Sequence, residues 1–186
     1  MGKLYLPTNQ FSFSSTEIPT LACCRGCSCF KLAGWDEFNL STGIWTIPGE
    51  RMKAGNERRV PLSPAALALI KSMSKIRLND WVFHGKGNGA PLSNMAMLEL
   101  LKRMERRGIT VHGFRSTFQD WASERTSYPR EVTEMALAHT IGDKVEAAYR
   151  RGDLFEKRRL LMAEWAKHCE TTKLPGKVVP LRRKRA

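Results

Sequence analysis

The chain has 186 residues and a formal net charge of +13, which is the size of one ordinary domain with room for a hydrophobic core. It contains no run of 18 apolar residues, so we expect no helix that spans a membrane. A positive surplus this large favours a polyanionic partner, either nucleic acid or an anionic membrane surface. The surplus lies after residue 50, because residues 1–50 hold three Lys or Arg against four Asp or Glu.

The first 34 residues have no clear periodicity. Their Ser, Thr, Pro and Cys residues follow neither the period of a strand nor that of a helix. No hydrophobic stretch followed by a small-residue cleavage site occurs there, so we predict no secretory signal and a cytoplasmic location. We expect residues 1–34 to be a degenerate or poorly ordered segment.

Four of the five cysteines lie close together in the stretch CCRGCSC: Cys23, Cys24, Cys27 and Cys29. The stretch contains one C-x2-C pair, which is half of a common structural zinc site. No second C-x2-C or H-x3-H pair follows at a suitable spacing, so we predict no metal site. In a reducing compartment these thiols would stay free.

From Trp35 onward the sequence becomes orderly, and a small sheet is predicted first. The stretches GIWTIP at 43–48 and RRVPLS at 58–63 read as short strands, joined by a connection that contains glycine. Together they predict a hairpin with a long tip. The stretch DWVFHG at 80–85 is interpreted as a brief third strand.

Helices dominate the rest of the sequence. Ser63 as N-cap and Pro64 at the first helical position predict a helix that begins at residue 64. Further helices are predicted at 93–108, between Ser93 and Gly108, and at 110–124, 130–138, 143–151 and 153–169. The predicted fold is therefore mainly α with a small antiparallel β-sheet near the N-terminus (α+β). A domain at 35–170 would be followed by a basic, disordered tail at 171–186.

The stretch TVHGFRSTFQDWASE at 110–124 combines two patterns. On a helix, the apolar side chains of Phe114, Phe118, Trp121 and Ala122 would share one flank. His112 and Arg115 would lie together about a quarter turn away. An imidazole and a guanidinium beside the free N–H groups of a helix N-terminus can bind a phosphate. The same pair at this spacing is also typical of a solvated helix edge.

Three further residues extend this candidate phosphate site: Lys53 at the predicted hairpin tip, His139 after EMALA, and Tyr149 in VEAAYRRG. The order Lys, His-x-x-Arg, His, Tyr in a basic helical domain resembles the catalytic domain of the tyrosine recombinases, the phage integrase family. The resemblance is closest to the integrases of satellite phages and genomic islands. The text that carries it includes WTIPGERMKAGNERRVPLS, VHGFRSTFQDWA and LAHTIGDKVEAAYRRGDLFEKRRLLMAEWA.

The resemblance implies a role for each residue. Tyr149 would attack a DNA phosphodiester and form a 3′-phosphotyrosyl link. Arg115 and His139 would stabilise the charged phosphate, and His112 would assist proton transfer at the phenol. Lys53 would protonate the leaving 5′-oxygen. The implied partner is double-stranded DNA, with self-association on DNA and with neither a cofactor, a membrane nor a small-molecule substrate. From the residues alone, Lys53 could also be a solvated loop lysine, His139 a helix C-cap and Tyr149 a packing residue of an amphipathic helix.

The sequence departs from the family in its first residues. The family has another arginine, in an Arg-x-x-Glu helix shortly before the tryptophan that corresponds to Trp35. Here the basic candidate is Arg25, and Ser28 stands three positions later. We therefore assign no role to Arg25, and we expect the chain to be an N-terminally truncated form, either active or inactive. Two alternatives stay open: a non-catalytic DNA-binding protein derived from an integrase, and a relative of the type IB topoisomerases.

Overall fold

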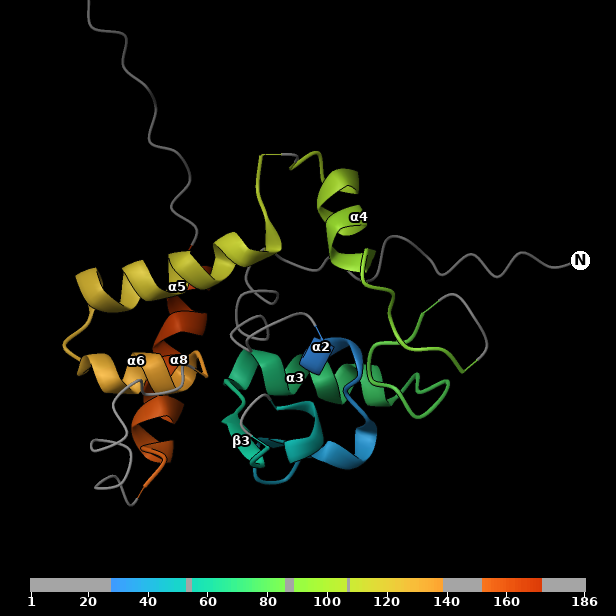
Figure 1. Ribbon diagram of the computed structural model, residues 1–186, viewed down its shortest axis with the longest axis horizontal. Coiled ribbons are helices and arrows are strands. Elements are labelled where there is room, and N and C mark those ends of the chain that lie inside the picture. Colours follow the sequence, from blue (N-terminus) through green and yellow to red (C-terminus); the bar gives the residue numbers. More distant parts are fainter. Residues whose placement is uncertain (1–27, 53–54, 86–88, 107, 139–151, 172–186) are drawn as a thin grey trace, which may run out of the picture.

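The structure is a computed structural model that describes residues 28–52, 55–85, 89–106, 108–138 and 152–171. Three helices, α5, α6 and α8, form one group, and a small sheet with α2 and α3 forms another (Figure 1). Helix α4 lies apart from both groups in the same view. This arrangement confirms the predicted fold class of a mainly helical chain with a small antiparallel sheet near its N-terminus.

The sheet has three antiparallel strands in the order β1-β2-β3: β1 (Phe38–Asn39), β2 (Ile44–Ile47) and β3 (Arg58–Pro61). Strands β2 and β3 confirm the predicted hairpin, and Trp45 pairs with both Val60 and Phe38. Strand β1 was not predicted, because two residues are too few to show an alternating pattern. The chain turns between β1 and β2 through Gly43, whose φ of +67° lies in the left-handed region.

The first hydrophobic core lies between this sheet and the helix that follows it. Helix α3 (Pro64–Ser74) begins as predicted, because the Ser63 side chain accepts a hydrogen bond from the Ala66 N–H (3.2 Å). Two residues from α2 (Ser28–Lys31) and the turn after it, Cys29 and Ala33, are buried in the same core. The sheet contributes its inward-facing side chains, including Trp45 and Ile47, which are fully buried.

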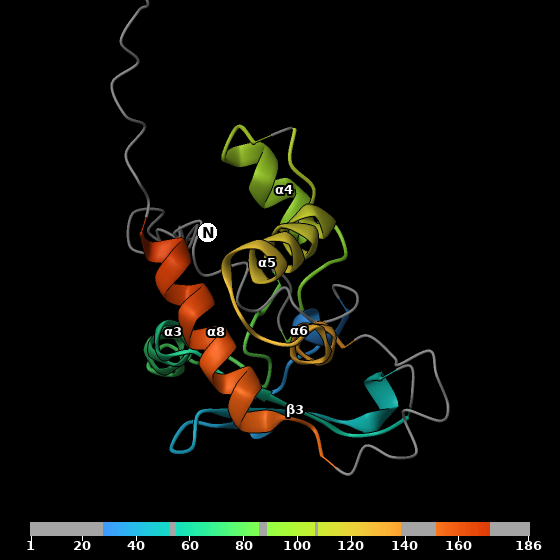
Figure 2. The same cartoon turned by 90° about the vertical axis from the view of Figure 1, so that its left-hand side faces the viewer.

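The second core lies among α5 (Val111–Arg125), α6 (Arg130–Ala136) and α8 (Phe155–Glu170). Its centre is aromatic: the Trp165 ring lies 5.4 Å from the Phe118 ring and 5.0 Å from the Trp121 ring. Helix α8 crosses the molecule beside α6 and also packs on β3 and α3 (Figure 2). This helix therefore joins the two cores.

Two predicted elements differ from the structure. Helix α4 covers Ala96–Arg103 and is shorter than the predicted 93–108, because Ser93 caps no helix and its carbonyl instead accepts from the Ala96 N–H in a turn. The stretch at 80–85 forms two isolated bridges, Gly34 with Trp81 and His84 with Pro91, in place of a strand. The predicted helix at 143–151 lies outside the described residues. None of the described helices is long and apolar enough to cross a membrane.

Candidate active site

The N-terminus of α5 carries the His-x-x-Arg motif. Thr110 caps the helix, and its side chain accepts a hydrogen bond from the Gly113 N–H (3.1 Å). His112 lies in the first turn and is exposed to solvent. Since the first backbone N–H groups of a helix point outward and favour negative charge, the first turn of α5 is suited to a phosphate oxygen.

Arg115 lies one turn further and is buried, with 8% of its surface exposed. The prediction of a polar face separate from the apolar stripe is therefore wrong for this residue. Spacings of three and seven residues place Arg115 on the same side of α5 as Phe118 and Ala122, both of which are buried. Phe114, which the prediction placed in the stripe, is only half-buried. Arg115 is thus buried on the side of α5 that faces the second core, one turn after the exposed His112.

The β2–β3 hairpin is fixed near its tip by Arg51, at the end of the short helix η2 (Gly49–Arg51). Its guanidinium is paired with the Glu37 carboxylate and donates hydrogen bonds to the carbonyl oxygens of Leu32 and Cys29, the latter at 3.1 Å. Glu37, in η1 (Trp35–Glu37), also accepts from the Trp45 indole N–H at 2.9 Å. Lys53, two positions after Arg51, lies outside the described residues.

Strand β3 contacts the end of α6. The Arg58 Nη2 atom donates to the carbonyl oxygens of Met135 and Ala136, the latter at 3.1 Å. These are among the last carbonyls of the helix, which have no partner within it. Ala138, just beyond, has a φ of +54°, in the left-handed region. His139 follows directly in the sequence and lies outside the described residues.

The same strand contacts the start of α8. The Arg59 Nη2 atom lies 3.1 Å from the Asp153 carboxylate, and the Arg158 Nη2 atom lies 2.8 Å from the same oxygen. Arg158 also donates to the carbonyl oxygens of Arg59 (2.9 Å) and Asp153 (2.7 Å). Tyr149, four positions before Asp153, lies outside the described residues.

Arg158 is almost fully buried, at 3% exposed. Burial lowers the pKa of its guanidinium to about 10, and the nearby charges of Arg58 and Arg59 act in the same direction, whereas Asp153 opposes them. The group is still cationic at neutral pH. Three guanidiniums, those of Arg59, Arg158 and Arg159, lie 4.9–5.5 Å from the centre of the Phe155 ring. The patterns in the sequence did not predict this cluster.

Tyr128 is the tyrosine within the described residues, and its environment disfavours nucleophilic attack. Its hydroxyl donates to the Glu164 carboxylate at 2.8 Å. Partial burial and this carboxylate raise the pKa of the phenol to about 12. A phenol that is harder to ionise and already engaged with an anion is a poor nucleophile for a phosphodiester. Within the same residues, no group of three or more His, Cys, Asp or Glu side chains could hold a metal ion.

The phage integrase family model matches residues 29–153, which is more than half of the chain. The chain therefore belongs to the phage integrase family, whose catalytic domain is that of the tyrosine recombinases. Prophage integrase IntA of Escherichia coli (strain K12) is 35% identical over 137 residues, which are 72% of this chain and 33% of the relative.

Two further relatives show the same extent of similarity. Prophage integrase IntZ of Escherichia coli (strain K12) is 32% identical over 138 residues, covering 73% of this chain and 34% of the relative. The integrase of Shigella phage Sf6 is 29% identical over 136 residues, covering 71% and 35%. The chain thus spans about a third of the length of the curated relatives that it matches.

Proposed function

We propose that this chain is the catalytic domain of a site-specific DNA recombinase that cleaves and rejoins double-stranded DNA through a 3′-phosphotyrosyl intermediate. The observation that carries the proposal is the family match over residues 29–153. That range includes all five residues to which the resemblance assigns a catalytic role: Lys53, His112, Arg115, His139 and Tyr149.

In the proposed reaction the phenol oxygen of Tyr149 attacks the phosphorus of a DNA phosphodiester. A new O–P bond forms and the bond to the 5′-oxygen breaks, so one strand ends in a 3′-phosphotyrosine and the other in a 5′-hydroxyl. His112 receives the phenol proton and Lys53 supplies a proton to the leaving oxygen. One phosphate ester bond forms for each one that breaks, so the 5′-hydroxyl of another strand can reverse the step without ATP.

Arg115 has the environment that charge stabilisation requires. The attacked phosphate gains negative charge in the transition state, and its stabilisation is stronger where water is excluded. Arg115 is buried one turn after His112, which is exposed in the first turn of α5, where the N-terminus of the helix favours an anion. With His139 as a second donor, cationic side chains would do the electrostatic work that a metal ion does in other phosphoryl-transfer enzymes.

Recombination joins strands from two duplexes, so we propose that several copies of the chain assemble on DNA. The basic composition after residue 50 supports double-stranded DNA as the partner. No membrane and no small-molecule substrate is part of the proposal.

A covalent trap tests the proposal. The full chain is incubated with a pool of duplexes of randomised sequence that carry a 5′-bridging phosphorothiolate, whose leaving thiolate cannot rejoin efficiently. We expect a protein–DNA adduct that survives denaturing gels. Tyr149→Phe should abolish the adduct, because it removes the attacking oxygen, and Tyr128→Phe is the matched control that should retain it.

The outcome also decides between the proposal and its alternative. DNA binding by the wild-type chain without any adduct would support a non-catalytic DNA-binding protein derived from an integrase. An adduct that forms equally well with Tyr149→Phe would contradict the assignment of the nucleophile.

A further inference from the structure

Strand β3 binds the chain on both sides of residues 139–151. On one side, Arg58 donates to the Met135 and Ala136 carbonyls at the end of α6. On the other side, Arg59 pairs with Asp153 just before α8 (3.1 Å). Arg158 strengthens the second attachment, because it bonds both Asp153 and the Arg59 carbonyl. Two consecutive strand residues thus bind Ala136 and Asp153, which are 17 positions apart in sequence and lie on either side of residues 139–151.

The backbone is strained at both attachments. Ala138 and Leu154 have φ values of +54° and +49°, and neither is a glycine. Residues with a β-carbon are disfavoured in this region and persist where the surrounding contacts fix them. Ala138 lies two positions after Ala136, whose carbonyl Arg58 binds, and Leu154 directly follows Asp153. The β3 contacts therefore lie where the chain direction changes on each side of residues 139–151.

The charges at the two attachments suit their partners. Arg58 meets the C-terminal end of α6, where the helix dipole favours a cation and where the Met135 carbonyl also accepts from the Ala138 N–H at 3.2 Å. Arg158 and Arg59 share the Asp153 carboxylate, whose second oxygen accepts from the Phe155 N–H at 3.1 Å at the start of α8. Both attachments thus satisfy backbone groups at helix ends, and both use the same strand.

We propose that Arg58 and Asp153 are positioning residues for the reaction: by holding the two ends of residues 139–151 on β3, they fix where His139 and Tyr149 stand relative to the hairpin that carries Lys53. The catalytic consequence rests on the proposed function. The attachment itself does not, since it follows from contacts between described residues. Neither side chain touches the DNA in this proposal.

The test uses the full chain with Arg58→Met, Arg58→Lys and Asp153→Asn. Arg130→Met is the matched control, because Arg130 lies on the same helix α6 but at its opposite end, in an exposed pair with Glu134. Each variant is first checked for an unfolding midpoint well above the assay temperature. Adduct formation on the phosphorothiolate pool is then measured as a single-turnover rate at saturating DNA, together with the Kd for DNA.

We expect Arg58→Met and Asp153→Asn to lower the single-turnover rate by about tenfold to a hundredfold, as small misplacements of reacting groups do. The Kd should change by less than about threefold, since no DNA contact is lost. Arg58→Lys should restore part of the rate, because an ammonium can donate to one of the two carbonyls. A purely structural role would lower the unfolding midpoint and leave the rate per folded molecule unchanged, which would overturn the proposal.

A second readout does not depend on activity. Hydrogen exchange of the amides in peptides that cover residues 139–151 should be faster in Arg58→Met and Asp153→Asn than in the wild type, with no change in Arg130→Met. Equal exchange in all four proteins would overturn the attachment. If the wild type forms no adduct, the proposed function fails, and the exchange rates alone decide whether the attachment exists.

Discussion

Arg115 is buried on the side of α5 that carries Phe118 and Ala122, and this burial determines how strongly its charge can act on a phosphate. A cation at the surface is screened by water and salt, whereas a cation with 8% of its surface exposed acts through a lower dielectric. His112, three positions earlier, is exposed and free to approach solvent or substrate. The two residues of one motif thus suit different roles, charge stabilisation for Arg115 and proton transfer for His112.

Tyr128 gives a prediction that depends on pH. Its phenol pKa is raised from about 10 to about 12, so its hydrogen bond to Glu164 stabilises the fold fully below pH 10 and is lost as the pH rises towards 12. Tyr128→Phe should lower the free energy of unfolding by about 1 kcal/mol at pH 8. Urea unfolding of both proteins between pH 8 and pH 12 checks this. A difference that grows with pH would contradict the assignment.

Arg158 gives a prediction about stability. It is 3% exposed and donates to two backbone carbonyls as well as to Asp153. Arg158→Met should cost about 2–4 kcal/mol, because it removes a donor from two carbonyl oxygens and one of the two arginine partners of the Asp153 carboxylate. Arg159→Met, next to it but half-buried, should cost less than about 1 kcal/mol. Chemical denaturation measures both, and equal costs would argue against the network.

At the scale of single elements, the β2–β3 hairpin is held by a close backbone approach. A β-carbon at Gly49 would lie 2.3 Å from the Gly55 carbonyl oxygen, a distance that side chains do not tolerate. Gly49→Ala should therefore displace the hairpin tip and lower the free energy of unfolding by about 1–3 kcal/mol.

The same substitution should also lower adduct formation on an ordinary phosphodiester, since the tip carries Lys53. A phosphorothiolate substrate needs no proton on its leaving sulfur, so its cleavage should fall much less. Gly55→Ala, where no atom lies within 4 Å of the new β-carbon but φ is +72°, separates backbone strain from the steric clash. Equal losses on both substrates would show that the tip does not deliver a proton.

Elements with strong local signals were predictable from the sequence. Helix α3 has Ser63 as N-cap and Pro64 at its first position, and α8 has a long apolar stripe that includes Trp165. Helix α4 was overestimated, because the cap residue Ser93 forms a turn before the helix begins. The stretch at 80–85 has the local pattern of a strand, but it forms only two isolated bridges, through Trp81 and His84.

The candidate site was predictable only in part. The motif at His112 and Arg115 is local and therefore visible in the sequence. The burial of Arg115 could not be predicted, because a helical wheel gives the direction of each side chain but does not show which other elements of the fold cover it. The bond from Arg158 to the Arg59 carbonyl joins residues 99 positions apart. Such a contact depends on how α8 docks on β3, and no short stretch of sequence encodes it.

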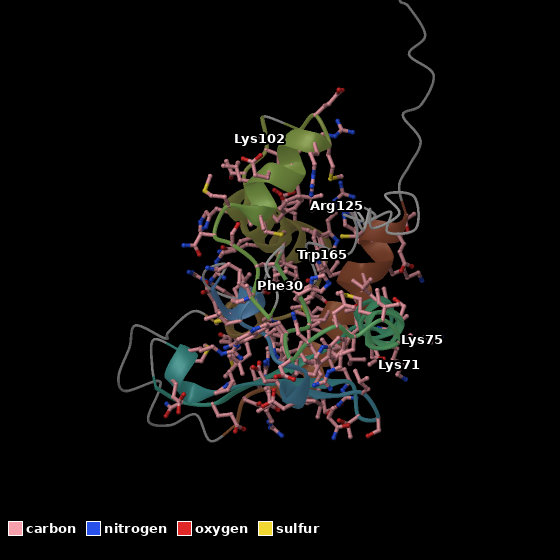
Figure 3. The ribbon with its side chains drawn as sticks, turned by 90° about the vertical axis from the view of Figure 1, so that its right-hand side faces the viewer. Phe30, Lys71, Lys75, Lys102, Arg125 and Trp165 are labelled. Carbon is pink, nitrogen blue, oxygen red and sulfur yellow. The ribbon has the colours of Figure 1, made fainter. Side chains whose placement is uncertain are left out.

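At the scale of the whole molecule, positive charge is spread over several elements. Figure 3 shows Lys71 of α3 and Lys75, which directly follows α3, at the edge of the molecule and Lys102 on α4, whereas Trp165 lies inside. All three lysines are exposed. Cations on separate elements can contact several backbone phosphates of one duplex at once.

Binding to DNA should therefore depend steeply on salt. The logarithm of the association constant should fall linearly with the logarithm of salt concentration, with a slope of about 0.9 for each phosphate neutralised. Fluorescence anisotropy with a labelled duplex between 50 and 200 mM salt measures the slope. Over this range the affinity of a protein for DNA typically falls by about 10³-fold. In the double variant Lys71→Gln, Lys75→Gln, the number of phosphate contacts calculated from the slope should fall by up to about two. A flat response would show that the basic surface is not the contact.

The measurement that tests the central claim most directly is the location of the covalent bond. The chain is trapped on the phosphorothiolate pool, digested with nuclease and protease, and analysed by tandem mass spectrometry. We predict a nucleotide remnant on the peptide that contains Tyr149, linked through its phenol oxygen to a 3′-phosphate. A remnant on Tyr128 or on any other residue, or an unmodified Tyr149 in a trapped complex, would contradict the account.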